Sequence, residues 1–199
     1  MSQLKSLIHS LCIARFRKYD KSSYNSEYFS NFRSAPEDNR AKYFQNFFEP
    51  QKTLDVGCGT GNLVWGLFNL GIEAYGVDLS EIPIQKASSE IQANLKVGDI
   101  QNLDYKENEF DLVTCCDVIE HLPFPECDEA IDELYRITNR WLFCHICLWT
   151  DKNARLDPTH VNLHSKWWWN KYFKRKGFTL IKPPKDFPSR KNSFIIKKN

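Results

Sequence analysis

A chain of 199 residues with a formal net charge of +2 is long enough for one domain with a substantial core, and it has no overall field that would attract nucleic acid. An apolar share of 42% and an aromatic share of 14% exclude a disordered chain. No apolar run reaches the ~18 residues of a membrane span, so we expect a folded protein without stable membrane insertion.

The first 18 residues predict an amphipathic helix, because apolar residues recur at helical spacing among basic ones. The segment has no acidic residue before Asp20. A mitochondrial transit peptide or a helix at a membrane surface is therefore an alternative to a helix that packs over the domain itself. A segment rich in aromatic residues follows over 19–32, and Pro36 is expected to open a helix that runs to about Phe48.

The run Thr-Leu-Asp-Val-Gly-Cys-Gly-Thr-Gly at 53–61 predicts a buried strand, a tight turn and the start of a helix. Glycines at alternate positions permit positive φ and let a ligand lie against the N–H groups of a helix start. A dinucleotide-binding fingerprint would have a third glycine at the position where this chain has Asn62, so the run argues against a dinucleotide. Asp78 ends the next expected strand, where a carboxylate can accept hydrogen bonds from ribose hydroxyls. Together these features predict a nucleoside cofactor.

Strands and helices alternate through the rest of the chain, which is typical of a parallel, doubly wound sheet. After the glycine run, strands are expected over 72–77, 95–98, 110–116 and 141–149, and helices over 82–93, 126–138 and 165–176. The last two strands, 178–181 and 193–197, are expected to pair as a hairpin at the sheet edge.

Four ordered motifs, at 55–61, 76–80, 98–100 and 110–122, resemble those of class I S-adenosylmethionine-dependent methyltransferases. The resemblance covers about residues 52–178. It implies an α/β, Rossmann-like, doubly wound sheet of seven mostly parallel strands, with helices on both faces and the last strand antiparallel. It also implies a helical cap or lid over residues 1–50, which forms one compact unit with a methyltransferase domain over 51–199.

The resemblance implies S-adenosyl-L-methionine as cofactor and S-adenosyl-L-homocysteine as product. Asp55 and the three glycines would seat the methionine portion, Asp78 the ribose, and Asp99 and Ile100 the adenine, although Asp99 could instead cap a turn. A lid ring would face the cationic sulfonium, unless the lid rings only cover core. The expected cofactor residues are Tyr28, Asp55, Gly57, Cys58, Gly59, Gly61, Asp78, Leu79, Asp99, Ile100, Asp117 and Val118.

A hydroxyl or protonated amine acceptor would need a general base, and His160 is our first choice because the ordinary histidine pKa is near neutrality. His121 and Asp157 are the other catalytic candidates, and each has a structural alternative as a turn or loop residue. A metal held by Asp157, His160 and His164 is weighed and not favoured, because these histidines precede the expected helix. No metal site is expected.

Three consecutive tryptophans, Trp167 to Trp169, fan out on their helix and cannot all be buried. Either at least one of them lines a site or a partner surface, or Trp168 packs inward with its neighbours on the surface, and we expect the second arrangement. The seven cysteines are interpreted as reduced core residues of a cytoplasmic protein.

The sequence thus predicts a methyltransferase, monomeric or homodimeric, that acts on a small molecule and not on nucleic acid. O-methylation of a sugar or natural-product hydroxyl or carboxylate is favoured. N-methylation of a peptide, amine or protein side chain is the alternative among enzymes, and a non-catalytic cofactor-binding subunit is the alternative of another class. The sequence does not identify the acceptor.

Overall fold

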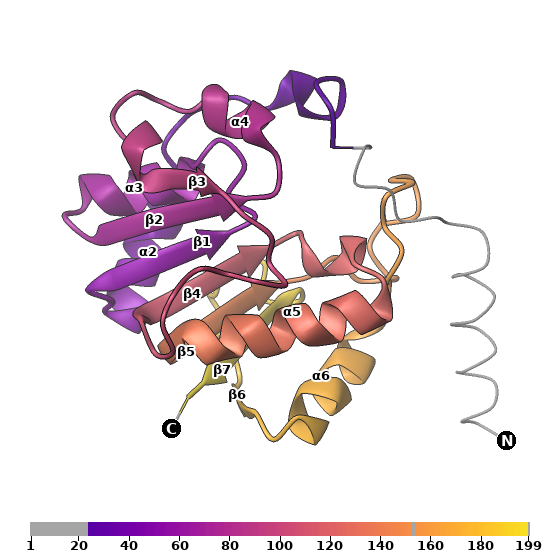
Figure 1. Ribbon diagram of the computed structural model, residues 1–199. Helices are drawn as coiled ribbons and strands as arrows, with labels where there is room; N and C mark the ends of the chain where they lie inside the picture. The colour runs from indigo at the N-terminus through magenta and orange to yellow at the C-terminus, as the bar shows by residue number, and fades with distance from the viewer. Residues whose placement is uncertain (1–23, 153, 199) are drawn as a thin grey trace, which may run out of the picture.

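The computed structural model describes residues 24–152 and 154–198, which build a seven-stranded sheet between two groups of helices (Figure 1). The amphipathic helix expected over residues 1–18 lies outside these residues. Within them, none of the helices has the length and apolar character that crossing a membrane requires.

The sheet has the strand order β3-β2-β1-β4-β5-β7-β6. The first five strands are parallel, and β7 runs antiparallel to both of its neighbours. Their bounds are β1 (Lys52–Val56), β2 (Glu73–Asp78), β3 (Leu95–Val97), β4 (Phe110–Cys116), β5 (Thr138–His145), β6 (Thr179–Ile181) and β7 (Ser193–Lys197). The Rossmann-like sheet is confirmed. The last two strands pair as predicted, but β7 lies inside the sheet and only β6 forms the edge.

Helices cover both faces of the sheet, as predicted. One core cluster contains the buried sides of α2, α3 and α4, and the other contains those of α5 and α6, which lie in front of the sheet in Figure 1. The bounds are α2 (Asp38–Phe48), α3 (Asn62–Asn69), α4 (Glu81–Gln85), α5 (Phe124–Ile137) and α6 (Lys166–Arg175), with short 3-10 turns η2 (Tyr28–Asn31), η3 (Gln92–Asn94) and η4 (Ile119–His121).

Two predicted elements end early, each for a local reason. The helix expected over 82–93 stops after α4, because Ser88 turns the chain: its N–H donates to Ser34 Oγ at 3.0 Å and its hydroxyl accepts from Glu90 N. The strand expected over 141–149 ends at His145. Its apolar pattern continues because Ile146 and Leu148 are buried in the core as part of a loop, not of a strand.

Helix α6 anchors the loop that leads into it. Ser165 caps the helix by accepting from Trp168 N at 3.1 Å, as predicted. The expected orientation of the tryptophans is wrong: Trp169 is fully buried and Trp167 is 67% exposed. Trp169 takes the inward position because Phe173 lies one turn further on the same face. Trp168 is half-buried and stacks on the His164 ring at 3.6 Å between centroids.

The burial of His164 makes the stability of the protein depend on pH. Burial lowers the pKa of His164 to about 4, from about 6.5 in an unfolded chain. Between these values the unfolded chain binds a proton that the folded protein does not, so falling pH favours unfolding, by up to about 3 kcal/mol. We expect the free energy of unfolding, measured with urea, to fall less between pH 7 and pH 4.5 in His164→Gln than in the wild type. An equal loss in both proteins would contradict this assignment.

Candidate active site

The turn between β1 and α3 has a backbone that only glycine adopts readily. Gly57, Gly59 and Gly61 have φ of 77°, 55° and 73°. Gly57 N donates to Val77 O at 2.7 Å, which ties the turn to β2. A Cβ atom at Gly57 would lie 2.2 Å from Val118 Cγ2. The turn therefore places backbone that carries no side chain at the carboxyl edge of the sheet, where ligands of open α/β sheets bind.

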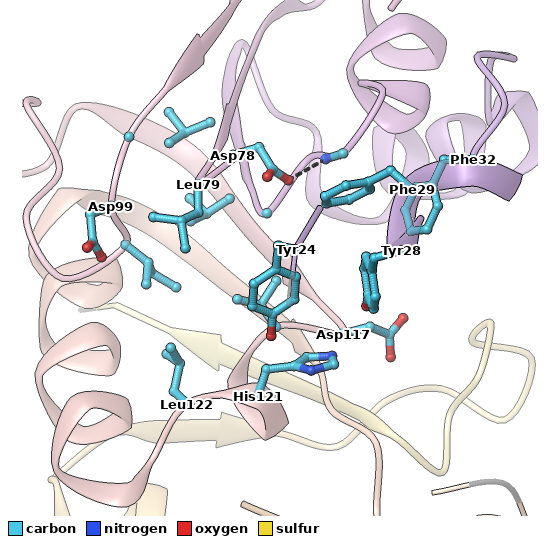
Figure 2. A pocket seen from close by; sticks show the side chains of 17 residues that line it. Tyr24, Tyr28, Phe29, Phe32, Asp78, Leu79, Asp99, Asp117, His121 and Leu122 are labelled. Carbon is cyan, nitrogen blue, oxygen red and sulfur yellow. Dashed lines mark hydrogen bonds between the residues drawn. The ribbon is translucent and has the colours of Figure 1, made fainter. Parts of the chain in front are cut away.

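A cleft of about 760 Å³, including its open mouth, lies over this turn (Figure 2). We call it the glycine cleft. Its walls come from the carboxyl ends of β1 to β4 and from the aromatic segment before α2. It is lined by Tyr24, Tyr28, Phe29, Phe32, Val56, Gly57, Gly59, Val77, Asp78, Leu79, Gly98, Asp99, Ile100, Asp117, Val118, His121 and Leu122. Most of the predicted cofactor residues are thus brought together here.

Asp78 is the fixed acid of the glycine cleft. Its carboxylate accepts from Gly59 N at 2.8 Å, drawn as the dashed line in Figure 2, and from Ser80 N at 2.9 Å. Burial raises its pKa, and the two backbone hydrogen bonds oppose that rise. A carboxylate has about four lone-pair sites, so two remain for a ligand that donates hydrogen bonds. Asp99 lines the cleft and also accepts from Gln101 N at 3.1 Å, so it is both a cleft residue and a turn cap.

Aromatic rings form one wall of the glycine cleft, as Figure 2 shows. Tyr28 and Phe29 lie with their ring centroids 5.0 Å apart, and Phe32 is 5.0 Å from Phe29. Lys86 Nζ donates to Phe29 O at 2.7 Å and so fixes the segment to the domain. Burial, with Asp157 and other nearby carboxylates, raises the pKa of Tyr28 to about 12. Its hydroxyl therefore remains a proton donor at neutral pH.

A second cleft, of about 1040 Å³ including open solvent, adjoins the first, and we call it the histidine cleft. It shares Tyr28, Phe32, Gly59, Asp117 and His121 with the glycine cleft. Its other lining residues are Glu37, Arg40, Asp55, Cys58, Thr60, Asn62, Leu63, Cys116, Glu120, Cys147, Asp157 and His160. Asp55 and Cys58 therefore line this cleft and not the glycine cleft. Gly61 lines neither, because its Cα faces Ile91 and Leu95.

The three predicted catalytic residues meet in the histidine cleft. The rings of His121 and His160 are 4.6 Å apart. His121 Nδ1 lies 2.8 Å from Thr159 Oγ1, whose hydroxyl donates to Asp157 Oδ1 at 2.5 Å, so Nδ1 of His121 carries the proton. His160 Nδ1 lies 2.7 Å from Ala154 O and must also be the donor. In a neutral imidazole with the proton on Nδ1 the lone pair is on Nε2, and Nε2 of His160 lies 3.8 Å from Asp157 Oδ2. Burial, followed by the adjacent His160, lowers the pKa of His121 to about 4, so that ring is neutral at pH 7.

Glu120 is a central residue of this cleft that the sequence did not identify. Its side chain is fully buried, and Oε1 accepts from Cys147 N at 2.8 Å. Oε2 has no hydrogen-bond partner among the described residues. Burial, with the nearby carboxylate of Asp117, raises the pKa of Glu120 well above its ordinary value. The available signal was an acid directly beside His121, just beyond the carboxyl end of β4.

Two further charged groups line the histidine cleft. Asp55 Oδ1 accepts from Thr114 Oγ1 at 2.5 Å, and burial raises the pKa of Asp55 to about 6. Arg40, on α2, forms an ion pair with Glu37 at 3.1 Å and gives the cleft a cationic wall. No motif in the sequence marks Arg40, because it enters the cleft only through the packing of α2 on α3.

Asp117 stands where the two clefts join. It has φ of 56°, an unusual conformation for a residue other than glycine, and its Oδ1 lies 2.9 Å from His145 Nδ1. Burial raises the pKa of Asp117, but the interaction with His145 outweighs it and holds the pKa below its ordinary value. Asp117 thus remains ionised, as a fixed negative charge at the junction.

The close approach of Gly57 to Val118 can be tested against a matched glycine. Gly71 has the same φ of 77°, but nothing lies within 4 Å of a Cβ atom there. Gly71→Ala should cost about 1–2 kcal/mol of unfolding free energy from backbone strain alone. Gly57→Ala should cost about 1–3 kcal/mol more because it overpacks the turn, and adding Val118→Ala should recover part of that excess. Urea unfolding measures all three, and equal losses at the two glycines would contradict the contact.

Comparison with known proteins agrees with this geometry. Residues 54–140 match the methyltransferase domain family. The chain is 36% identical over 83 residues to a ubiquinone biosynthesis O-methyltransferase of Alkalilimnicola ehrlichii. This alignment covers 39% of this chain and 34% of that protein. Its namesake in Coxiella burnetii is 34% identical over 94 residues, covering 44% and 40%. The matches thus span well under half the length of these relatives.

Solved structures extend the likeness to most of the fold. A S-adenosylmethionine-dependent methyltransferase from Archaeoglobus fulgidus superposes with a TM-score of 0.67 at 20% identity, over 88% of this chain and all of that one. Magnesium protoporphyrin IX methyltransferase from Synechocystis PCC 6803, solved with bound S-adenosylhomocysteine, gives 0.61 at 24% identity over 80% of each chain. The domain match, the strand order and the glycine turn agree: residues 54–140 match a methyltransferase domain, and the fold is the one seen in these S-adenosylmethionine-dependent methyltransferases.

Proposed function

We propose that this protein is a S-adenosylmethionine-dependent O-methyltransferase that acts on a small hydroxylated molecule. The observation that carries the proposal is the junction of the two clefts at Tyr28, Asp117 and His121. One cleft has the features of a nucleoside site, and the other has polar groups suited to an acceptor. A cofactor in the first would meet an acceptor in the second, which is the arrangement that methyl transfer requires.

The residues of the glycine cleft fit the cofactor. The lone pairs of Asp78 that face the cleft would accept from ribose hydroxyls, Asp99 and Ile100 would hold the adenine, and the bare backbone at Gly57 and Gly59 would admit the methionine portion. When bound, S-adenosylmethionine supplies an activated methyl group on a sulfonium cation. The aromatic wall and the ionised Asp117 would favour a cation at the junction.

The histidine cleft favours an oxygen acceptor. A hydroxyl has to lose its proton during methylation. His121 directs Nδ1–H to Thr159 Oγ1 and is neutral at pH 7, so its Nε2 lone pair is suited to interact with an acceptor hydroxyl, and the His160 ring lies beside it. Asp157 orients His121 through Thr159 and so acts as a positioning residue. The names of the curated relatives, which are O-methyltransferases, agree with this preference.

Cofactor binding is tested by thermal unfolding with S-adenosylhomocysteine. At about 100 times its Kd the ligand should stabilise the protein by about 2.7 kcal/mol and raise its Tm by roughly 5–10 °C. Asp78→Ala should abolish the shift, because it removes the acceptor for ribose hydroxyls. Asp104→Ala, which removes an exposed acid, should leave the shift unchanged. If the wild type shows no shift, the cofactor assignment is wrong.

Methyl transfer is tested with a methyl-labelled donor and a pool of phenols, sugars, carboxylates and amines. We expect mass spectrometry to identify an O-methyl product. His160→Ala should lower kcat by about 10²–10⁴, because it removes the predicted general base, and should keep the S-adenosylhomocysteine shift. A product methylated only at nitrogen would contradict O-methylation, and unchanged turnover would remove His160 from the reaction.

A further inference from the structure

We propose that the surface between α6 and the β6–β7 hairpin binds an acidic segment of a partner protein. A groove of about 1800 Å³, including open solvent, lies there, and we call it the basic groove. Its lining comes from α6, β6, β7 and the loop between the two strands (Figure 1). Among the described residues, it shares none with the lining of the glycine cleft or the histidine cleft. It is therefore a separate surface, independent of the proposed function.

The charged side chains that line the basic groove are all positive. Seven of its lining residues are lysines or arginines, and none is an aspartate or a glutamate. Lys191 is paired with Asp151 at 2.7 Å. Within the described part of the chain the other six form no ion pair with a carboxylate: Lys166, Lys171, Lys174, Arg175, Lys182 and Arg190. Because the whole chain has a formal net charge of only +2, this concentration of cations is local and would attract an anionic partner.

Lys166 is the half-buried member of this set. Its Nζ donates to Ser193 O and lies 3.6 Å from the centroid of the Phe194 ring. Burial, with Arg190 nearby, lowers the pKa of Lys166 to about 8. Lys166 is also the first residue of α6, whose first turn has no acid, so the positive end of the helix dipole adds to its charge. A carboxylate at this end of the groove would stabilise the charged lysine and offset the repulsion from Arg190.

The basic groove also has apolar positions, which a simple anion would not use. Trp167 is 67% exposed, and Lys171 Nζ lies 5.0 Å from the centroid of its ring. Leu180 and Ile181, on β6, are half-buried in the lining. Tryptophan is enriched at protein interfaces, where it often contributes much of the binding free energy. The lining therefore suits a segment with both acidic and apolar side chains.

The size and composition of the basic groove favour a peptide over other anions. Its volume is more than twice the 760 Å³ of the glycine cleft, measured in the same way, which suits a polymer better than a small anion. Single-stranded nucleic acid stacks successive bases on several aromatic rings. Trp167 is the only exposed aromatic ring among the described lining residues, because Phe194 is 1% exposed. The flat surface of a lipid bilayer would not reach the half-buried Lys166 and Leu180, whereas a peptide can enter the groove.

Binding is tested on the full chain with a fluorescent peptide of about 12 residues, in which aspartate and glutamate are interspersed with leucine and phenylalanine. Fluorescence anisotropy measures its Kd. We expect saturable binding that weakens as salt rises, because the attraction is between charges at a solvent-exposed surface. The matched peptide, with asparagine and glutamine in place of the acids, should bind at least about tenfold more weakly.

Two double variants with the same change in net charge locate the site. Lys171→Glu with Lys174→Glu reverses two exposed cations of the groove and should weaken binding by about tenfold or more. Lys42→Glu with Lys185→Glu reverses two exposed lysines outside the groove and should leave the Kd within about twofold of the wild type. Trp167→Ala should weaken binding by about tenfold. All these side chains are exposed, so an unchanged Tm without ligand checks that each variant is folded.

Three results would overturn the proposal: no binding of the acidic peptide by the wild type, equal binding by the two double variants, or equal binding of the acidic and amide peptides. A single-stranded oligothymidylate of the same length and vesicles of phosphatidylglycerol are tested alongside. Tighter binding of either one, lost in Lys171→Glu with Lys174→Glu, would assign the groove to nucleic acid or to lipid and would also overturn the proposal.

Discussion

The hydrogen bond from Gly59 N to Asp78 Oδ2, at 2.8 Å, is the constraint on which the rest of the site depends. It joins the turn after β1 to the end of β2, and it works only because the glycines of the turn can adopt positive φ. The same bond orients the Asp78 carboxylate toward the cleft. A single local geometry therefore fixes both the bare backbone and the acid that a nucleoside cofactor needs.

Glu120 has the corresponding structural role in the histidine cleft. Its main-chain oxygen accepts from Val161 N and Asn162 N, both at 2.9 Å, while its side chain accepts from Cys147 N. These bonds hold the loop between β5 and α6 against the end of β4, and this loop brings His160 to His121. One buried acid thus fixes the loop and directs an oxygen atom into the cluster that the loop completes.

The sheet and the residues that line the glycine cleft could be predicted from the sequence because they depend on local signals. Positive φ selects glycine at Gly57, and the acid at Asp78 follows its strand directly. The histidine cleft could not be predicted in the same way. The grouping of Glu120 with His160 depends on how a loop docks, and short-range periodicity does not encode that. Trp169 is an intermediate case, because Phe173 four residues later marks the buried face of α6.

We have proposed that a cofactor in the glycine cleft meets an acceptor at the junction of the two clefts. A crystal structure of the protein with S-adenosylhomocysteine would locate both ends of the cofactor. We expect the ribose on Asp78, the adenine beside Asp99 and Ile100, and the sulfur at the junction formed by Tyr28 and His121. S-adenosylhomocysteine bound elsewhere, or with its sulfur turned away from the histidine cleft, would contradict it.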